Sequence, residues 1–328
     1  MKAVVVARYG APVEIVDVPE PVLKPRDLRV KVAAASLNPL DYKIRDGKVK
    51  LVIRRKPPIV LGCDIAGTVV AVGFEVTGFA VGDEIFARLD KYWMGGLAEY
   101  ACVDEALAAK KPGTSTMVEA ASIPLAGLTA LQALRDKIGA TPGQRVLIQA
   151  GAGGVGSLAI QIGKILGLWV ATTTSTKNVE LVTSLGADQV VDYKKQNVSV
   201  LDELDGVFDS LGPASELESI AVTKRGGIVV GVGGLPDAEF RRQAMPWFTA
   251  PAIWAMTAKR RAAAKRHGVT FKYLYMRPDG AELAELATWI SQGTLKPLVH
   301  QVFPFAQVRE AFAELERGHA RGKIVVEL

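Results

Sequence analysis

Three glycines with a fixed spacing are the clearest chemical feature of the sequence. Gly151, Gly153 and Gly156 lie in the stretch "AGAGGVG" in G-x-G-x-x-G register. A buried-strand pattern at residues 146–149 precedes them, and a helical apolar face follows. Free N–H groups at a helix start bind anions, and glycines let a pyrophosphate approach the backbone. The context therefore predicts a dinucleotide site, and the alternative is a glycine-rich turn that holds no nucleotide.

Each glycine has its own expected role in such a site. We expect Gly151 to permit the tight turn, Gly153 to admit the pyrophosphate, and Gly156 to allow close packing of the helix on the strand. Gly154 and Val155 lie between them in the sequence and belong to the predicted cofactor-binding set.

The end of the next predicted strand indicates which nucleotide binds. An NAD site normally has Asp or Glu about 20 residues after the glycines, where it holds the ribose hydroxyls. Here the sequence is "ATTTSTKN", with Ser175 and Thr176 as neutral donors and Lys177 as a cation that suits a 2′-phosphate. We therefore expect no carboxylate in this place and predict NADP(H). The alternative for Lys177 is an exposed lysine at a helix start, without a ligand.

The surrounding elements fall into two patterns. Short Val-rich runs, punctuated by Gly and Pro, continue to about residue 105 and indicate an antiparallel β domain. From about residue 122 strands alternate with helical segments, which implies a doubly wound parallel sheet. The sequence therefore predicts an α/β protein with a parallel Rossmann sheet and a separate antiparallel β domain.

Composition excludes several classes of protein. The chain has 328 residues, of which 49% are apolar and 23% charged, as in ordinary globular proteins of more than one domain. Its two cysteines are too few for a disulfide scaffold, and a reducing, cytoplasmic location fits best. The first residues lack the pattern of a secretory leader, and no apolar run reaches membrane-spanning length. The net charge of +6 is spread along the chain, so we expect small anionic ligands rather than nucleic acid. We expect no membrane partner either.

Two neighbouring segments leave alternatives open. The stretch "MPWFTAPAIWAM" is aromatic and apolar, which suits a lid over a hydrophobic substrate, a subunit contact or plain core. The stretch "AKRRAAAKRH" is a dense basic helix, whose simplest interpretation is a solvated helix face. Contact with nucleic acid or with an anionic membrane is the alternative for this helix.

Several motifs together resemble the medium-chain dehydrogenase/reductase superfamily over essentially the whole chain. They are "LNPLDYKIRDG", "GCDIAGTVVAVG", "GGLAEY", "AGAGGVGSLAIQIGK", "SLGADQVVDY" and "RGKIVV". They are most similar to the zinc-independent quinone oxidoreductase branch, in its enone oxidoreductase and chloroplast-envelope quinone oxidoreductase-like group. The resemblance implies a GroES-like catalytic domain at residues 1–121 and 278–328, and a Rossmann NADP(H)-binding domain at residues 122–277.

The same resemblance bears on metal binding. Zinc alcohol dehydrogenases hold the catalytic metal with a cysteine, a histidine and a second cysteine. This chain has Asn38 and Cys63 at the first two positions and no cysteine near Leu125, whereas a zinc site needs three protein ligands. The short "RLDKYWMGGLAEY" replaces their structural zinc lobe. We therefore expect no metal, and we expect Cys63 to be a small buried apolar residue, with a modifiable thiol as the alternative. Cys102 is expected in the core.

Lys43, in "NPLDYK", is the predicted catalytic residue. Without a metal Lewis acid, acceptors that need little activation are favoured, such as enones, enals and quinones. Hydride addition to the β-carbon leaves negative charge on the carbonyl oxygen, which requires a donor or cation. The resemblance places Lys43 at this oxygen, with Tyr42 as a pocket residue or proton donor. The alternative is a surface lysine paired with Asp41 or Asp46, and Asn38 and Asp41 are expected to fix the loop.

The resemblance implies further cofactor contacts outside the glycine-rich turn. Gly231 and Val232, at the end of a strand, and Thr129, on a helix, are expected at the nicotinamide. Tyr193 is expected at the adenosine phosphate. Arg321 and Lys323 are expected to reach the cofactor from the returning C-terminal segment. The alternatives are tight turns for the glycines of "GVGG", packing or capping for Thr129, and solvated strand-edge charge for the basic pair.

The sequence therefore predicts an enzyme, an NADPH-dependent reductase of α,β-unsaturated carbonyls or quinones that transfers hydride without zinc. The expected partners are a small hydrophobic electrophilic substrate and a second copy of the chain in a homodimer, with "FKYLYM" as a candidate sheet edge. Two alternatives stay open. One is a nucleotide-binding regulatory or crystallin-like protein without turnover, and the other is a one-electron quinone reductase.

Overall fold

The computed structural model describes residues 1–90 and 94–328 and divides the chain into two compact units. Unit 1 consists of residues 1–128 and 277–328, and unit 2 of residues 129–276. The first division falls inside helix α3 (Pro124–Leu131), whereas the sequence predicted a boundary at residue 121. The stretch "RLDKYWMGGLAEY", predicted to replace a zinc lobe, includes residues 91–93, which lie outside the described residues.

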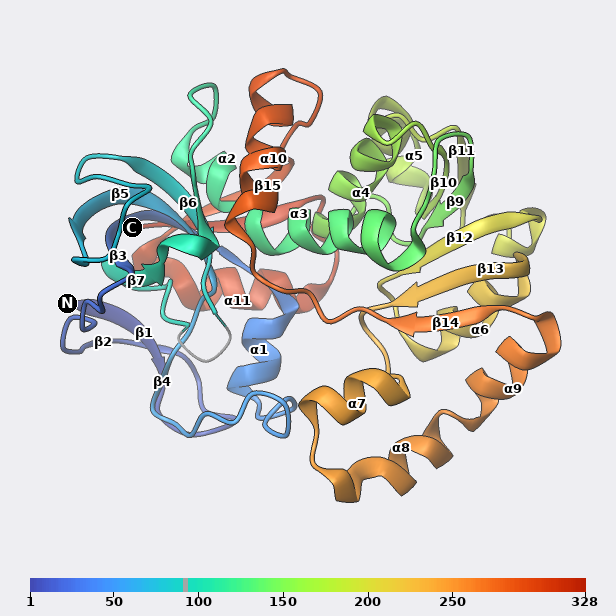
Figure 1. Ribbon diagram of the computed structural model, residues 1–328, viewed down its shortest axis with the longest axis horizontal. Helices are drawn as coiled ribbons and strands as arrows, with labels where there is room; N and C mark the ends of the chain where they lie inside the picture. Colours follow the sequence, from blue (N-terminus) through green and yellow to red (C-terminus); the bar gives the residue numbers. More distant parts are fainter. Residues whose placement is uncertain (91–93) are drawn as a thin grey trace. The chain divides into compact units, whose positions relative to one another are not determined.

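Unit 2 is built on a parallel sheet with the strand order β11-β10-β9-β12-β13-β14 (Figure 1). Its strands are β9 (Arg145–Ile148), β10 (Trp169–Thr174), β11 (Gln189–Asp192), β12 (Leu204–Asp209), β13 (Thr223–Gly231) and β14 (Thr270–Tyr273). The strand order reverses direction between β9 and β12, and nucleotides bind at the carboxyl edge of such a sheet. The predicted doubly wound parallel sheet is confirmed.

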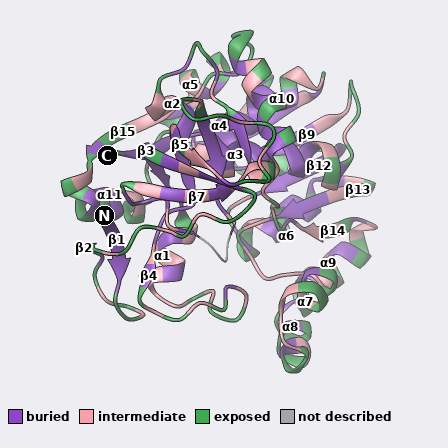
Figure 2. Ribbon diagram, turned by 60° about the vertical axis from the view of Figure 1, so that its left-hand side comes forward, coloured by how far each residue is buried: buried purple, intermediate pink, exposed green. Residues whose placement is uncertain are grey.

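Helices cover this sheet because its strands are apolar on both faces, as in "RVLI" of β9. The covering helices are α4 (Gly154–Ile165), α5 (Val179–Ser184), α6 (Pro213–Ala221) and α9 (Ala258–His267). Between β13 and α9 the chain also forms α7 (Ala238–Ala244) and α8 (Ala250–Met256), which contact each other. A π-helical segment, Gln132–Ile138, follows α3 and packs against β12 and β13. Figure 2 shows β12 and β13 as buried, whereas α8 is largely exposed.

Unit 1 is mainly antiparallel β structure. Its larger sheet has the order β15-β16-β3-β5-β6-β8, with β7 paired to β3, and a smaller sheet has the order β2-β1-β4. The strands are β1 (Lys2–Val6), β2 (Glu14–Asp17), β3 (Asp27–Leu37), β4 (Ile59–Val60), β5 (Asp64–Val72), β6 (Glu84–Arg88), β7 (Tyr100–Asp104), β8 (Ala108–Lys110), β15 (Val299–Pro304) and β16 (Lys323–Glu327). The predicted antiparallel β domain is confirmed, although β15 and β16 pair in parallel.

Few helices accompany these sheets within unit 1. They are α1 (Pro39–Arg45), α2 (Met117–Ala121), α3, α10 (Gly280–Ser291) and α11 (Val308–Arg317). On β7 the side chains of Ala101 and Val103 are buried, and Cys102 lies on the opposite, half-exposed face. The predicted core position of Cys102 is therefore wrong, because strand neighbours alternate between faces. Among the described residues no helix has the length and apolar character needed to cross a membrane.

Candidate functional site

The glycine-rich turn joins β9 to α4 in unit 2. Gly153 has extended backbone and caps the helix, which begins at Gly154. The first N–H groups of a helix have no intrahelical acceptor, so those of Gly154 and Val155 are available to an anion at this end. Both residues are partly exposed. The turn therefore presents these N–H groups at a partly exposed surface, and binding of a dinucleotide there stays a prediction.

Steric contacts explain two of the three glycines. A Cβ on Gly156 would lie 2.2 Å from the carbonyl oxygen of Ala150, so close packing of helix on strand requires a glycine. A Cβ on Gly151 would lie 2.1 Å from Oγ1 of Thr172 on β10, and the positive φ of the turn, 57°, belongs to Ala150. Gly151 is thus required by its approach to β10 rather than by a tight turn, which corrects the expectation.

Gly153 has no comparable internal reason to be glycine. The nearest atom to a Cβ built on it is the carbonyl oxygen of Ala150, at 3.3 Å. Packing within the protein therefore does not require a glycine at this position. This fits the predicted pyrophosphate, which needs a close approach to the backbone.

The end of β10 carries the residues predicted to select the nucleotide. Lys177 is exposed, and Oγ1 of Thr176 donates to Oδ2 of Asp192 at 2.6 Å. As predicted, β10 itself ends without a carboxylate, but Asp192 reaches Thr176 from the neighbouring strand β11. The Thr176 hydroxyl, followed by the N–H of Lys194, which donates to Oδ1 at 3.0 Å, lowers the pKa of Asp192. This carboxylate is therefore ionised and already engaged within the protein.

Tyr193 lies next to this segment. Its N–H donates to the carbonyl of Thr174 at 3.0 Å, which brings it to the end of β10 beside Ser175. Its ring is 57% exposed, and Nζ of Lys194 lies 5.4 Å from the ring centroid. The structure thus gathers Tyr193, Ser175 and Thr176 at the carboxyl edge of two neighbouring strands.

The loop after β13 packs on a buried carboxylate. A Cβ on Gly231 or Gly234 would lie 2.9 or 2.1 Å from Oε1 of Glu216, which comes from α6. Val232 donates its N–H to the Asp209 carbonyl and accepts the hydroxyl of Tyr273 at 3.1 Å. Burial, followed by the nearby Glu216 charge, raises the pKa of Tyr273 to about 12. The glycines are therefore needed to accommodate Glu216, which sequence analysis did not identify.

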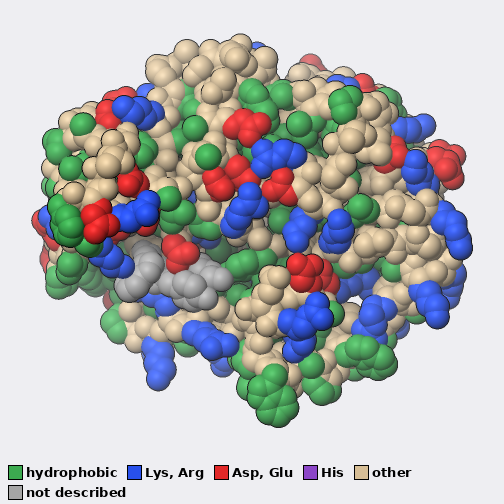
Figure 3. All heavy atoms as spheres, in the orientation of Figure 1, with side chains coloured by type: hydrophobic (Ala, Val, Ile, Leu, Met, Phe, Trp, Pro, Cys, Tyr) green, Lys and Arg blue, Asp and Glu red, His purple; other side chains and the backbone are tan. Residues whose placement is uncertain are grey.

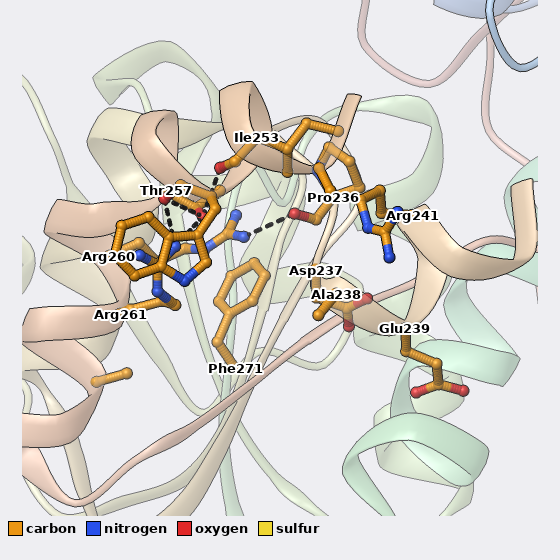
Figure 4. A pocket seen from close by; sticks show the side chains of 13 residues that line it. Pro236, Asp237, Ala238, Glu239, Arg241, Ile253, Thr257, Arg260, Arg261 and Phe271 are labelled. Atoms are coloured by element: carbon orange, nitrogen blue, oxygen red, sulfur yellow. Dashed lines mark hydrogen bonds between the residues drawn. The ribbon is translucent and has the colours of Figure 1, made fainter. Parts of the chain in front are cut away.

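Arg260 holds the same loop from α9. Its guanidinium pairs with Glu216 at 3.0 Å and donates to the carbonyls of Leu235 at 2.6 Å and Pro236 at 3.0 Å. It also lies 3.8 Å from the centroid of the Phe271 ring. Figure 4 shows both side chains. Burial raises the pKa of Glu216, although the Arg260 charge opposes the rise. The expected solvated helix face is therefore wrong for Arg260, which is buried.

Two predicted cofactor residues lie elsewhere. Thr129 is buried in α3, and Arg321 is exposed just before β16 in unit 1. Their contacts with the cofactor stay predictions.

Helix α1 of unit 1 carries Tyr42 and Lys43. The Asn38 N–H donates to Oδ2 of Asp41 at 2.7 Å, the Asp41 N–H donates to the Asn38 carbonyl at 2.9 Å, and Pro39 occupies the first helical turn. The expectation that Asn38 and Asp41 fix this loop is confirmed. Tyr42 is half-buried and packs against the core of unit 1.

Lys43 itself is half-buried on this helix. Its ammonium makes no hydrogen bond or ion pair with residues 1–90 or 94–328. Desolvation, followed by the charge of Lys48, lowers the pKa of Lys43. The alternative of a lysine paired with Asp41 or Asp46 is wrong, because Asp46 binds Arg45 at 2.8 Å and Lys48 at 2.9 Å, and Asp41 caps the helix.

A buried polar cluster lies at the base of α1. Oδ2 of Asp64 accepts from Nδ2 of Asn38 at 2.9 Å and from the Ser36 hydroxyl at 3.1 Å, and Oδ1 accepts from the Leu125 N–H at 3.0 Å. Nζ of Lys323 lies 3.5 Å from Oδ2 of Asp64 and donates to Oδ1 of Asn38. Lys323 is therefore buried in this cluster, which corrects the expectation that it reaches a cofactor or lies in solvent.

Comparison with known proteins identifies the family. The description "Alcohol dehydrogenase GroES-like domain" fits residues 24–113, and "Zinc-binding dehydrogenase" fits residues 185–326. The chain is 34% identical to the chloroplast envelope quinone oxidoreductase homolog of Arabidopsis thaliana over 97% of this chain and 96% of the relative. The chain belongs to the medium-chain dehydrogenase/reductase superfamily.

Two further members of this superfamily are similar over most of the chain. The NADPH-dependent alkenal/one oxidoreductase, chloroplastic, of Arabidopsis thaliana is 37% identical, over 99% of this chain and 79% of its own. The solved structure of the quinone oxidoreductase from Coxiella burnetii matches with a TM-score of 0.86 at 32% identity, and covers 100% of this chain and 99% of that one. The superfamily fold, a GroES-like β domain with a Rossmann domain, is thus present throughout.

At the positions where zinc members of the superfamily hold metal, this member has a different arrangement. The resemblance places Asn38, Cys63 and Leu125 at these positions; in the structure Asn38 contacts Cys63, and the Lys323 ammonium donates to Asn38. Cys63 has no exposed surface, and burial raises the pKa of its thiol well above the ordinary value, so the prediction of a small buried residue is confirmed. In the part of the chain that the structure describes, no three His, Cys, Asp or Glu side chains are grouped to hold a metal ion.

Proposed function

We propose that this protein is an NADPH-dependent oxidoreductase that reduces α,β-unsaturated carbonyls or quinones by hydride transfer, without zinc. The observation that carries the proposal is the Lys43 ammonium. It is half-buried, it has no partner in the described ranges, and it stands on a helix whose start is fixed by the buried Asp41. A desolvated cation without an internal partner is poised for an anion that the reaction supplies.

The chemistry follows from the charge that develops on the acceptor. Bound NADPH supplies the hydride, which the β-carbon of the enone accepts, so that the electron pair moves to the carbonyl oxygen. Lys43 donates a hydrogen bond to that oxygen and stabilises the enolate, and its partial desolvation strengthens this interaction. Water then delivers a proton to the α-carbon, and Tyr42 lines the acceptor pocket. No general acid besides water is required.

Two observations support NADP(H) over NAD(H). The carboxylate nearest the end of β10, Asp192, is engaged by Thr176 and Lys194 and is not presented to a ribose as a free acceptor pair. Lys177 adds a cation at the same exposed strand end, where a 2′-phosphate is recognised. One relative is named as NADPH-dependent, and its named substrates are alkenals and alkenones.

The remaining proposals concern the setting of the protein. We propose a homodimer, since β14 is an edge strand of the parallel sheet and its outer side is open to pairing with a second copy. We also propose a cytoplasmic location, a small hydrophobic electrophile as substrate, and no nucleic-acid partner. The Rossmann unit alone would equally serve a regulatory nucleotide-binding protein, so turnover decides between the two functions.

The deciding experiment follows the loss of NADPH absorbance with a short enone, an enal and a quinone, after treatment with a chelator. Lys43→Ala should lower kcat/KM on the enone about 10²–10³-fold, as the loss of one oxyanion donor does, and leave NADPH affinity unchanged. The matched control is Lys50→Ala, which removes an exposed lysine close by in the sequence and should have no effect. Semiquinone signals with the quinone would indicate one-electron reduction instead.

Two results contradict the proposal. Tight NADPH binding without turnover on any of the three acceptors would favour the regulatory or crystallin-like alternative. Turnover that Lys43→Ala leaves intact would retain the reductase and remove Lys43 from its mechanism.

A further inference from the structure

The segment that contains α7, α8 and α9 has an unusual distribution of charge. Residues 237–268 contain seven Lys or Arg and two acidic residues, Asp237 and Glu239, whereas the whole chain has 40 Lys or Arg and 34 Asp or Glu. Most of the net charge of +6 is therefore concentrated in about a tenth of the chain. Within the segment, residues 243–258 carry no charged side chain at all. The basic residues stand at both ends of this uncharged stretch.

The uncharged stretch exposes large apolar side chains. Among residues 1–90 and 94–328, seven bulky hydrophobic side chains are more than 60% exposed, and four of them lie within 247–256. They are Trp247 at 83%, Phe248 at 61%, Trp254 at 68% and Met256 at 63%. Figure 3 shows hydrophobic side chains projecting at the edge where Figure 1 places α8, with Lys and Arg beside them. Exposed aromatic clusters of this kind mark interaction surfaces.

The surface is held in place by the protein. Arg260 binds inward to Glu216 and anchors α9. Its neighbour Arg261 faces the other way, donates to the Trp254 carbonyl and to Oγ1 of Thr257, and lies 4.3 Å from the centroid of the Trp254 ring. A hollow of about 530 Å³ lies between α7, α8, α9 and β14, with Ile253, Trp254 and Phe271 in its wall (Figure 4). The exposed indole is therefore positioned, with a cation stacked on it.

We propose that this surface, formed by α7, α8 and α9, docks the protein on a lipid bilayer with anionic headgroups. Trp247, Phe248, Trp254 and Met256 enter the interfacial layer, where aromatic side chains are stabilised. Arg242, Lys265 and their basic neighbours bind the headgroups, at about 1 kcal/mol for each cation near an anionic surface. The sequence analysis predicted no membrane partner, and this proposal departs from it because the segment concentrates both cations and exposed aromatic side chains.

Other occupants fit the surface less well. The hydroxyls of Thr249 and Thr257 donate to the carbonyls of Pro246 and Ile253 within the stretch itself, so they offer no base-reading donors beside the exposed rings. A second copy of the chain would bring together the remaining cations of both segments, Arg260 being buried and paired, which costs electrostatic free energy. An anionic bilayer satisfies both the cations and the apolar side chains.

The test is co-sedimentation of the full chain with vesicles of phosphatidylcholine, alone or mixed with phosphatidylserine. We expect binding to the mixed vesicles, weakened by salt, and little binding to phosphatidylcholine alone. The variant Trp247→Ala/Phe248→Ala/Trp254→Ala should lower the partition coefficient about tenfold or more. Its matched control, Val22→Ala/Phe74→Ala/Val81→Ala, removes three equally exposed apolar side chains from unit 1 and should bind as the parent does.

A charge variant completes the design. Lys265→Glu/Arg266→Glu should also lower binding about tenfold, whereas Lys31→Glu/Lys50→Glu, with the same change of net charge in unit 1, should have a small effect. NADPH binding should be retained in every variant, which shows that they fold. Brominated lipids should quench the tryptophan fluorescence of the parent and quench the Trp247 and Trp254 variants less.

Three outcomes overturn the proposal. The first is no binding to phosphatidylserine vesicles at low salt. The second is equal loss of binding in the segment variants and in their unit 1 controls. The third is a dimer or a DNA complex that the aromatic or charge variant breaks, with no vesicle binding by the parent. Enone turnover in the same samples is independent of all three, so this proposal and the proposed function fail separately.

Discussion

Each unit has a buried ion pair next to a segment of the candidate site, and the two ion pairs use different basic residues. In unit 2, Arg260 pairs with Glu216 and gives its remaining N–H groups to the carbonyls of Leu235 and Pro236. In unit 1, Lys323 lies 3.5 Å from Asp64, and its partners are side chains. A guanidinium is a rigid planar fork, whereas an ammonium is a compact point charge. The arginine can therefore fix backbone directly, and the lysine acts by balancing charge within a network.

The difference matches what each unit has to hold. The loop after β13 has no regular structure of its own, so its carbonyls need donors of fixed direction. Helix α1 is already stabilised by its cap. The buried Asp64 carboxylate at the base of this helix requires a positive charge nearby, which Lys323 supplies. The loop after β13 therefore requires the directed donors of an arginine, whereas the cluster below α1 requires only the positive charge of a lysine.

Removing the arginine should give the largest effect. Arg260→Ala leaves Glu216 buried and unpaired, which should lower the free energy of unfolding by about 3–5 kcal/mol and weaken NADPH binding through the freed loop. Arg260→Lys should recover less than half of this loss, because one ammonium cannot serve three directed acceptors. Urea unfolding and NADPH titration measure the two quantities. Full rescue by lysine would show that direction does not matter here.

Breaking the lysine pair should cost somewhat less. Asp64→Asn leaves the Lys323 charge without its carboxylate, and we expect a loss of about 3 kcal/mol in the free energy of unfolding. The double variant Asp64→Asn/Lys323→Met should lose less than the sum of the two single variants, because it removes both charges. Urea unfolding of all four proteins gives the coupling. Additive losses would contradict charge balance as the role of this pair.

Asp41, whose carboxylate has no ion pair with residues 1–90 or 94–328, should show the opposite effect on stability when it is replaced. Burial raises the pKa of Asp41 from 3.8 to about 6, so the folded state binds its proton more tightly than the unfolded state does. The cost of ionising it is absent below about pH 4, grows between pH 4 and 6, and is fully present above. Asp41→Asn should therefore stabilise the protein above about pH 6 by about 2 kcal/mol, after the weaker bond from Asn38 is counted.

The measurement for Asp41 is urea unfolding at several pH values between about 4 and 8. The gain from Asp41→Asn should shrink to near zero at the acid end. A gain that does not change with pH, or a loss at neutral pH, would show that the ionised carboxylate is favourable in this cluster.

A substitution in the glycine-rich turn should change the free energy of unfolding least, because the predicted nucleotide contacts there are made by the backbone. Gly153→Ala should change the free energy of unfolding by no more than about 1 kcal/mol, because the nearest atom to the new Cβ is 3.3 Å away. NADPH affinity should nevertheless fall about tenfold or more, because the methyl group occupies the place of the pyrophosphate. Isothermal titration measures it, and Gly113→Ala, whose Cβ would meet nothing within 4 Å, is the control. Unchanged affinity would remove Gly153 from the site.

Most of the fold and the nucleotide turn could be predicted because their signals are local. The spacing of Gly151, Gly153 and Gly156 and the alternation of strands with helices are contained in short stretches of sequence. The capping role of Asp41 is local for the same reason. Prediction failed for the partners of buried charges, because Arg260 meets Glu216 across 44 residues and Lys323 meets Asn38 across 285.

The sequence pattern also failed to predict how adjacent side chains in one element are oriented. Arg260 and Arg261 are adjacent in one basic helix, yet one points into the unit and the other contacts an exposed indole. The rotation of a helix about its own axis, and the register of β7 that turns Cys102 to the outer face, are set by packing against distant elements. The amino-acid composition of a helix or strand therefore does not determine which of its side chains point inward.

The placement of the two cysteines has a consequence for a protein that handles enones. Such acceptors alkylate thiolates, so an enzyme that concentrates them is exposed to damage by its own substrate. Burial raises the pKa of both thiols, and Cys63 has no exposed surface. The fraction of thiolate at neutral pH is thereby lowered for both cysteines, and Cys63 is also shielded by burial from the molecules on which the protein is proposed to act.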